Sequence, residues 1–235
     1  MNWQAAEIKP SERIIVALDV ATSEEALALV RQLAPHPGLF KIGLQLYTAA
    51  GPEIVRAVRD LGGRIFLDLK LHDIPNTVGR AVESASSLGV EMLTLHLSGG
   101  RDMIKAAVSS TGEETLLLGV TVLTSSDEAT LRETGVNCSM QEQVLRLAQL
   151  GVESGIRGLV ASPHELGALR SAHRAKIKIV TPGIRPSGSG AGDQKRVTTP
   201  AEALRAGADF LVIGRPITAA ADPRDALARI LADVV

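Results

Sequence analysis

The sequence predicts an α/β protein of the (β/α)8-barrel (TIM-barrel) class, and three observations support that class. Short apolar runs alternate with amphipathic helical patterns along the whole chain. Eight such runs occur, which is the number of parallel strands that closes a barrel. The chain has 235 residues, close to the roughly 250 that a compact barrel needs. An open, doubly wound sheet shows the same alternation and is the alternative.

The expected strands are nearly continuous in Val, Ile, Leu and Ala, as is typical of parallel strands covered on both faces. They are Ile14–Val20, Phe40–Leu44, Ile65–Leu71, Met92–Leu97, Leu116–Leu123, Leu159–Ser162, Ile179–Ile184 and Phe210–Gly214. No shift in composition and no linker divides the chain. We therefore expect a single domain over residues 1–235, which favours the closed barrel over the open sheet.

Helical patterns fill the intervals between these strands. The clearest are Ser23–Leu33, Pro52–Leu61, Thr77–Leu88, Gln141–Gly151 and Ala201–Ala206. Ser23 and the pair Thr199-Pro200 are typical of helix starts. Several patterns end near a glycine, which favours helix termination there; these glycines are Gly62, Gly89, Gly151 and Gly207.

Composition excludes several classes of function. Lys and Arg total 25 and Asp and Glu total 26, a net charge of −1 that attracts neither nucleic acid nor an anionic membrane. The single cysteine, Cys138, excludes an internal disulfide or a multi-cysteine zinc site. No apolar run approaches the roughly 20 residues of a membrane span, and the N-terminal residues do not resemble a signal peptide. We expect a cytoplasmic protein.

Charged residues lie in the first three expected strands, toward the end of a barrel where active sites are built. In the third strand, Asp68 and Lys70 alternate with leucines and are therefore expected to point into the barrel mouth. Asp19 lies at the end of the first expected strand, and Lys41 lies in the second. The pattern predicts an array of alternating cations and anions.

Two interpretations of this array remain open on the residues alone. It is either a structural ion-pair network or a catalytic centre. Burying several charges costs several kcal/mol per ion unless the geometry compensates, so their presence together favours use in catalysis. A lysine beside carboxylates is stabilised as an ammonium ion, which suits a proton donor better than an imine-forming nucleophile.

The seventh and eighth strand–helix units contain a second group of candidate functional residues. A glycine-rich segment, 186–194, follows Arg185, and the eighth strand ends in Gly214-Arg215. The loops after strands seven and eight are the usual phosphate site of this fold. Glycine permits a close backbone approach, and arginine supplies forked donors. A glycine-rich segment alone most commonly indicates a flexible surface loop, but beside two arginines at this place in the barrel we expect it to close as a lid over a phosphate site.

Other polar residues carry weaker signals. His96 ends the fourth strand and His72 follows the third, where each is either a hydrogen-bond partner of the site or a structural histidine. Thr124 and Ser125 follow the fifth strand, and without further information they are typical of helix caps. The chain lacks an HExxH pair, a Walker loop and a GxSxG elbow, and we expect no metal.

The segment Asp68-Leu-Lys70-Leu-His-Asp73-Ile-Pro-Asn-Thr77 resembles the D-x-K-x-x-D-I-P-N-T signature of the orotidine 5′-phosphate decarboxylase family. The resemblance extends over the chain in the family's order. Further matching segments are Val16–Asp19, Phe40–Gly43, Pro182–Gln194 and Ile213–Ile217. The short D-x-K-x-x-D core also occurs in related sugar-phosphate barrels, whereas the I-P-N-T extension is more specific.

This resemblance implies conversion of orotidine 5′-phosphate into UMP and CO2, a step of pyrimidine synthesis, by a homodimer without cofactors. It implies that Lys70 protonates C6 of the pyrimidine and that Asp68 lies near the departing carboxylate. Lys41 and Asp19 would contact the ribose and position Lys70. Asp73, which belongs with Lys70, Asp68 and Lys41 in the expected catalytic set, would act in the neighbouring subunit's site.

The resemblance also implies the remaining substrate contacts. Thr77, like Asp73, would reach across the dimer interface, and Thr124 and Ser125 would contact the pyrimidine ring. The phosphate would be held by a set of residues from the last two units, namely Arg185, Gln194, Gly214 and Arg215.

Two other functions remain as alternatives. A sugar-phosphate decarboxylase such as 3-keto-gulonate-6-phosphate decarboxylase uses the same core to hold Mg²⁺ and an enediolate. A non-catalytic phosphate sensor is expected to have lost the lysine or a carboxylate, and this chain retains them all.

Overall fold

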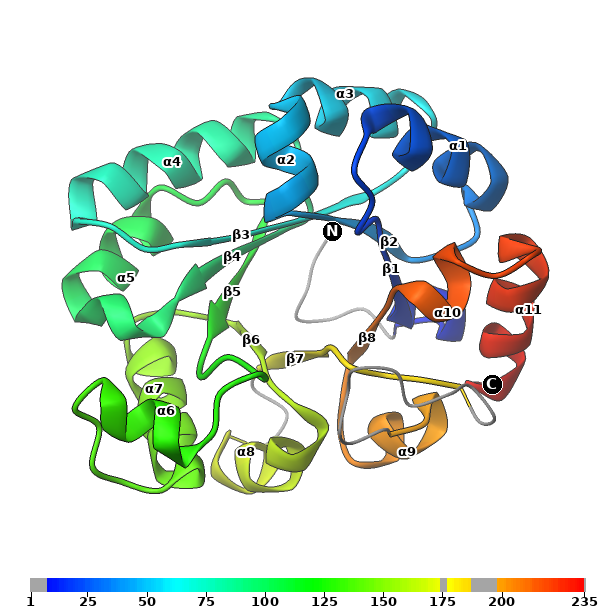
Figure 1. Ribbon diagram of the computed structural model, residues 1–235. Coiled ribbons are helices and arrows are strands. Elements are labelled where there is room, and N and C mark those ends of the chain that lie inside the picture. The colour runs from blue at the N-terminus through cyan, green and yellow to red at the C-terminus, as the bar shows by residue number, and fades with distance from the viewer. Residues whose placement is uncertain (1–7, 174–176, 187–197, 235) are drawn as a thin grey trace.

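In the computed structural model, residues 8–173, 177–186 and 198–234 are described. Eight parallel strands form a closed barrel in sequence order, with helices around the outside (Figure 1). The strands are β1 (Ile14–Ala17), β2 (Leu39–Gly43), β3 (Ile65–Leu71), β4 (Met92–His96), β5 (Leu116–Val120), β6 (Gly158–Val160), β7 (Lys178–Thr181) and β8 (Phe210–Ile213). β1 pairs with β8, which closes the barrel. The predicted barrel is confirmed, and the open sheet is wrong.

The helices of the described residues lie mostly between consecutive strands. They are α1 (Ser23–Leu33), α2 (Leu44–Ala50), α3 (Glu53–Asp60), α4 (Pro75–Ser87), α5 (Gly100–Ser109), α6 (Glu128–Glu133), α7 (Met140–Glu153), α8 (Leu166–His173), α9 (Pro200–Arg205), α10 (Arg215–Thr218) and α11 (Pro223–Asp233). Short 3-10 turns occur at Pro10–Arg13, Leu97–Gly99 and Pro163–Glu165. None of the helices in the described ranges has the length and hydropathy needed to cross a bilayer.

Several predicted strand ends extend too far toward the mouth. β1 ends at Ala17 rather than Val20, β5 ends at Val120, and β7 ends at Thr181. The chain leaves the sheet early because the mouth is built from loops, in which apolar residues such as Leu123 are exposed. Leu44, expected in a strand, instead begins α2.

Helix ends follow local capping chemistry. Thr22, rather than Ser23, caps α1, because its hydroxyl accepts the Glu25 backbone N–H and the Glu25 carboxylate accepts the Thr22 N–H. Thr199 caps α9 in the same way, as the sequence indicates. Gly151 lies inside α7 and does not end it.

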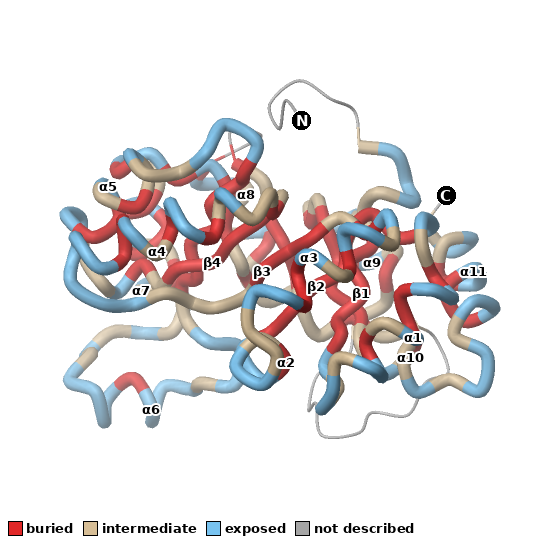
Figure 2. Tube along the Cα trace, turned by 90° about the horizontal axis from the view of Figure 1, so that it is seen from above, coloured by how far each residue is buried: buried red, intermediate tan, exposed pale blue. Residues whose placement is uncertain are grey.

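Buried apolar residues form two clusters, and Figure 2 shows that the barrel strands are largely buried. The larger cluster joins the outward faces of the strands to the helices. The smaller cluster fills the barrel interior with residues from alternate strand positions. Its members are Ile15, Ala17, Leu39, Phe66, Met92, Leu116, Leu118, Val180, Phe210 and Val212. These residues form the apolar floor of the barrel mouth, and the polar residues of the mouth lie directly above them.

The end of the barrel opposite the mouth is held by charged hydrogen bonds. The guanidinium of Arg170, in α8, donates to the carbonyls of Gly207 and Ile177, at 2.8 Å each, and forms an ion pair with Asp209. Asp209 also accepts the Ile179 backbone N–H at 2.7 Å. These bonds tie α8 to the starts of β7 and β8, so this end of the barrel contributes to stability.

Candidate active site

The inward-facing positions change from apolar to polar at the mouth. In the first four strands the last apolar positions of the interior are Ala17, Leu39, Phe66 and Met92. Two residues further along, the side chains face the same way because the strand period is two. Those positions hold Asp19, Lys41, Asp68 and Thr94. The polar layer therefore lies directly above the apolar floor.

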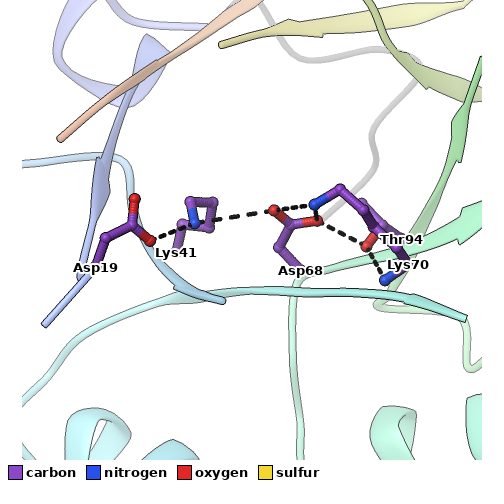
Figure 3. A network of polar contacts seen from close by, with 5 residues as sticks. All are labelled: Asp19, Lys41, Asp68, Lys70 and Thr94. Carbon is purple, nitrogen blue, oxygen red and sulfur yellow. Dashed lines mark hydrogen bonds and ion pairs between the residues drawn. The ribbon is translucent and has the colours of Figure 1, made fainter. Parts of the chain in front are cut away.

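The charged side chains form one continuous array across the mouth (Figure 3). The ammonium of Lys41 lies 2.8 Å from Asp19 Oδ1 and 3.8 Å from Asp68 Oδ2. The ammonium of Lys70 donates to both oxygens of Asp68, at 2.9 Å each. The array predicted from the sequence is present in the order Asp19, Lys41, Asp68, Lys70.

Exposure differs along the array. The side chains of Lys41 and Asp68 are 11% and 13% exposed, whereas those of Lys70 and Asp19 are 36% and 61% exposed. Asp68 is thus a nearly buried carboxylate between two ammonium groups. With two carboxylates and two ammonium groups, the array is balanced in charge, which offsets the cost of removing its inner members from water.

The backbone at Lys70 is unusual. Its φ of 51° is the only positive φ of a non-glycine residue in the part of the chain that the structure describes. Here the register of β3 against β4 shifts, because Leu67 pairs with Leu93 but Leu71 pairs with Leu95. Bulges and left-handed residues cluster at functional sites, where they redirect a side chain. The bulge replaces the simple alternation that the sequence predicts.

Asp73 lies outside the array of its own chain. It is exposed, and its carboxylate accepts the backbone N–H of Ile74 at 2.6 Å. Thr77, on the first turn of α4, is also exposed, and Ile74 between them is 66% exposed. The predicted roles of Asp73 and Thr77 across a dimer interface remain predictions.

His96 and His72 lie side by side next to the array, with ring centroids 5.7 Å apart. Burial, and after it the neighbouring His72 and Lys70, lower the pKa of His96 below its ordinary value, while Asp68 acts in the opposite direction. His96 is therefore neutral at pH 7. Its ring lies beside Lys70 without adding a positive charge there.

The expected phosphate residues are only partly described. A Cβ placed on Gly214 would lie 3.8 Å from Asp19 Oδ2, so this glycine adjoins the array. Arg215, which is exposed, begins α10 directly after Gly214. The Arg185 backbone N–H donates to the Thr198 carbonyl at 3.1 Å. Gln194 and the expected lid over 187–193 lie outside the described residues.

Thr124 and Ser125 are exposed in a turn beyond β5. They do not cap α6, because Asp127 does so by accepting the Thr130 backbone N–H at 2.9 Å. The capping interpretation of this pair is therefore wrong. Their expected contact with a substrate ring stays a prediction.

Two residues of the site, Thr94 and Gly43, were not predicted from the sequence. Thr94 is fully buried and bonds to both Asp68 and Lys70. Gly43 lies so close to the array that a Cβ on it would stand 3.0 Å from the Lys41 ammonium. Both occupy ordinary strand positions, and only the pairing of neighbouring strands reveals their contacts. Among the described residues, no three His, Cys, Asp or Glu side chains gather as potential metal ligands.

Comparison with known proteins yields one family. Residues 12–230 match the model of the "Orotidine 5'-phosphate decarboxylase / HUMPS family". The chain is 51% identical to the orotidine 5′-phosphate decarboxylase of Moorella thermoacetica over 95% of this chain and 92% of that protein. It is also 51% identical to the enzyme of the same name from Anaeromyxobacter sp. strain K, over 96% of this chain and 99% of that one.

A solved structure agrees with these sequence matches. The crystal structure of orotidine 5′-phosphate decarboxylase from Lactobacillus acidophilus superimposes with a TM-score of 0.84 at 37% sequence identity. The match covers 94% of this chain and 98% of that one. Similarity at this level extends through the barrel rather than being confined to the D-x-K-x-x-D segment.

Proposed function

This chain belongs to the orotidine 5′-phosphate decarboxylase family, and we propose that the array of Asp19, Lys41, Asp68 and Lys70 performs the family's reaction. The enzyme is a carboxy-lyase of pyrimidine biosynthesis that converts orotidine 5′-phosphate into UMP and CO2. The observation that supports the residue assignment best is the contact of the Lys70 ammonium with both oxygens of Asp68 at the barrel mouth.

Lys70 supplies the proton in the proposed mechanism. The bond between C6 and the carboxylate breaks, CO2 leaves, and the electron pair remains at C6. The Lys70 ammonium then transfers a proton to C6, which gives UMP and a neutral lysine that solvent reprotonates. The half-exposed side chain of Lys70 suits this role, because it reaches both the substrate and water.

The array stabilises the negative charge that develops at C6. Enzymes lower barriers by about 8–23 kcal/mol, and a carbanion that the ring cannot delocalise places this reaction toward the upper end. An ammonium already fixed in place stabilises such charge without reorganisation. Repulsion between Asp68 and the substrate carboxylate is a smaller and disputed contribution.

Lys41 and Asp19 hold the other side of the substrate in this proposal. Their 2.8 Å ion pair fixes the Lys41 ammonium beside Asp68, so that ribose hydroxyls would meet fixed charged partners. The phosphate would bind near Gly214 and Arg215, with Arg185 and Gln194 nearby. Binding energy from this remote phosphate contributes to the transition state as well as to affinity. Thr124 and Ser125 would contact the pyrimidine.

We also propose a homodimer with shared active sites. Large apolar side chains are exposed around the mouth after β2, β3 and β5, namely Leu44, Ile74 and Leu123. A second subunit would cover such residues, and Asp73 and Thr77 would then face the neighbouring site. The barrel forms one catalytic domain in this proposal. A phosphorylated substrate that does not cross bilayers unaided is consistent with a cytoplasmic enzyme.

The decisive experiment is turnover in the absence of metal. Purified protein in buffer with EDTA is expected to convert orotidine 5′-phosphate into UMP, followed by the change in ultraviolet absorbance. A sugar-phosphate decarboxylase of the Mg²⁺-dependent kind would lose its activity to the chelator and regain it with Mg²⁺. Absence of turnover under both conditions would remove the proposed function.

The role of Lys70 is tested by Lys70→Ala with Lys178→Ala as the matched control. Lys178 is likewise paired with an aspartate, 3.7 Å from Asp209, but at the opposite end of the barrel. Lys70→Ala is expected to lower turnover at least 100-fold while UMP still binds, and Lys178→Ala to leave turnover near the native value. Native turnover in Lys70→Ala would refute the role of proton donor.

The shared site is tested by mixing subunits. Lys70→Ala and Asp73→Ala proteins are each expected to be nearly inactive, whereas hybrid dimers contain one site with both native residues. Mixtures should therefore recover part of the native activity once subunits have exchanged. Mixtures that stay inactive despite exchange, measured with tagged subunits, would contradict the assignment of Asp73 to the neighbouring site.

A further inference from the structure

Thr94 stands opposite the bulge that carries Lys70. Leu67 and Leu71 of β3 pair with Leu93 and Leu95 of β4, so three residues of β3 face one residue of β4. That one residue is Thr94, which is fully buried. Because the bulge breaks the regular ladder between the strands, the Lys70 backbone N–H needs another acceptor.

The hydroxyl of Thr94 meets this need and at the same time binds the catalytic carboxylate. It accepts the Lys70 backbone N–H at 2.9 Å and donates its own hydrogen to Asp68 Oδ1 at 2.9 Å. A hydroxyl has one hydrogen to give, so this donation to Asp68 orients it. One side chain thus joins the backbone of Lys70 to the carboxylate that holds the Lys70 ammonium (Figure 3).

We propose that Thr94 is a positioning residue for decarboxylation, whose hydroxyl fixes the left-handed backbone of Lys70 and the orientation of Asp68 together. The inference rests on the proposed function of Lys70 as proton donor. Without the hydroxyl, the Lys70 N–H and one lone pair of Asp68 lose their partner, and the ammonium is no longer held at one place. Thr94 itself does not touch the substrate in this proposal.

The sequence alternation alone does not bring Lys70 to its position. A strand that continued without the bulge would keep Lys70 on the ladder, with its N–H bonded to a backbone carbonyl. The positive φ of 51° at Lys70 is unfavourable for a residue with a side chain, so a neighbouring group must hold it. Thr94 supplies two contacts at the bulge that do so, one to the Lys70 backbone and one to Asp68.

The experiment compares hydroxyl-bearing and hydroxyl-free side chains at position 94. Thr94→Val keeps the branched shape but lacks the hydroxyl, while Thr94→Ser keeps the hydroxyl but lacks the methyl. Thr115→Val is the matched control, because Thr115 is also buried and donates to the Val90 carbonyl at 2.8 Å, at the opposite end of the barrel.

Thr94→Val is expected to lower kcat by about 10- to 100-fold, the value of a hydrogen bond to a charged group, with KM within about threefold of native. Thr94→Ser should recover kcat to within a few-fold of native, and Thr115→Val should turn over like the native enzyme. If Thr94→Val does not fold, as judged by circular dichroism, Thr94→Ala provides the same comparison.

Two outcomes would overturn the proposal. One is a Thr94→Val enzyme with native kcat; a rise in its KM alone would indicate lost substrate binding rather than positioning. The other is a Thr94→Ser enzyme as impaired as the valine variant, which would show that the methyl matters instead. An inactive native enzyme, by contrast, would refute the proposed function itself.

Discussion

Substituting Asp68 with asparagine tests whether the array is one electrostatic unit. The side chain keeps its size, but the carboxylate between the ammonium groups of Lys41 and Lys70 becomes neutral. The new amide NH2 also has to face one of these ammonium groups, donor against donor. We expect both the free energy of unfolding and the turnover to fall.

The Lys70–Asp68 distance and the exposure of these side chains give the expected size of the loss in stability. At an effective dielectric constant of about 20, unit charges 2.9 Å apart interact by about 6 kcal/mol, most of which offsets lost hydration. Removing one partner of a buried pair costs about 3–5 kcal/mol. Because the Lys70 side chain is 36% exposed and retains some hydration, we expect Asp68→Asn to lower the free energy of unfolding by about 2–4 kcal/mol. Turnover should fall at least 100-fold, because the Lys70 ammonium loses its anchor.

Asp19→Asn is the matched control. Asp19 also contacts a lysine, at 2.8 Å from Lys41, but its side chain is 61% exposed, and a solvated pair contributes only about 0–1 kcal/mol. Urea denaturation gives the two stabilities, and the absorbance assay gives turnover. Equal stability losses in both variants, or an Asp68→Asn enzyme as stable and active as the native one, would refute the reasoning.

Other substitutions test other parts of the molecule. The pKa of His96 is lowered in the folded state, so the unfolded chain binds more protons below about pH 6.5 and stability falls as the pH drops through that range. His96→Asn should flatten this fall in urea denaturations at successive pH values; an unchanged slope contradicts it. Arg170→Ala should lower the free energy of unfolding by about 3 kcal/mol with unchanged kcat, since it leaves Asp209 partly buried without this partner. A change in kcat without loss of stability would contradict this purely structural role. Gly43→Ala should lower turnover about tenfold by placing a methyl 3.0 Å from the Lys41 ammonium; native turnover would show that the array adjusts freely.

The barrel and the array could be predicted because both follow from short-range periodicity. Eight apolar runs define the strands, and a period of two places Asp68 and Lys70 on one face. Asp73 is three residues beyond Lys70, so the same alternation does not place it on their face. Its carboxylate lies outside the array because the chain leaves the sheet at Leu71 and exposes the next residues.

The bulge and its partner depend on how two strands pair, which periodicity does not encode. Thr94 resembles any β-branched strand residue in the sequence, and its proposed positioning role depends on facing the extra residues of β3. The short helix α2 was missed for a related reason. Its apolar residues continue directly from β2, and Leu44 at its start is 62% exposed, so hydropathy alone extends the strand.

The left-handed backbone of Lys70 has a consequence for how this family can change over time. Glycine adopts a φ of 51° without steric cost, so selection for stability alone favours glycine at position 70, whereas selection for the proposed proton transfer would retain lysine. A copy of this gene released from that selection is therefore expected to exchange the lysine for glycine, because glycine relieves the backbone and most other residues do not. Lysine in so unfavourable a conformation is the residue that selection for the proposed proton transfer would keep at this position.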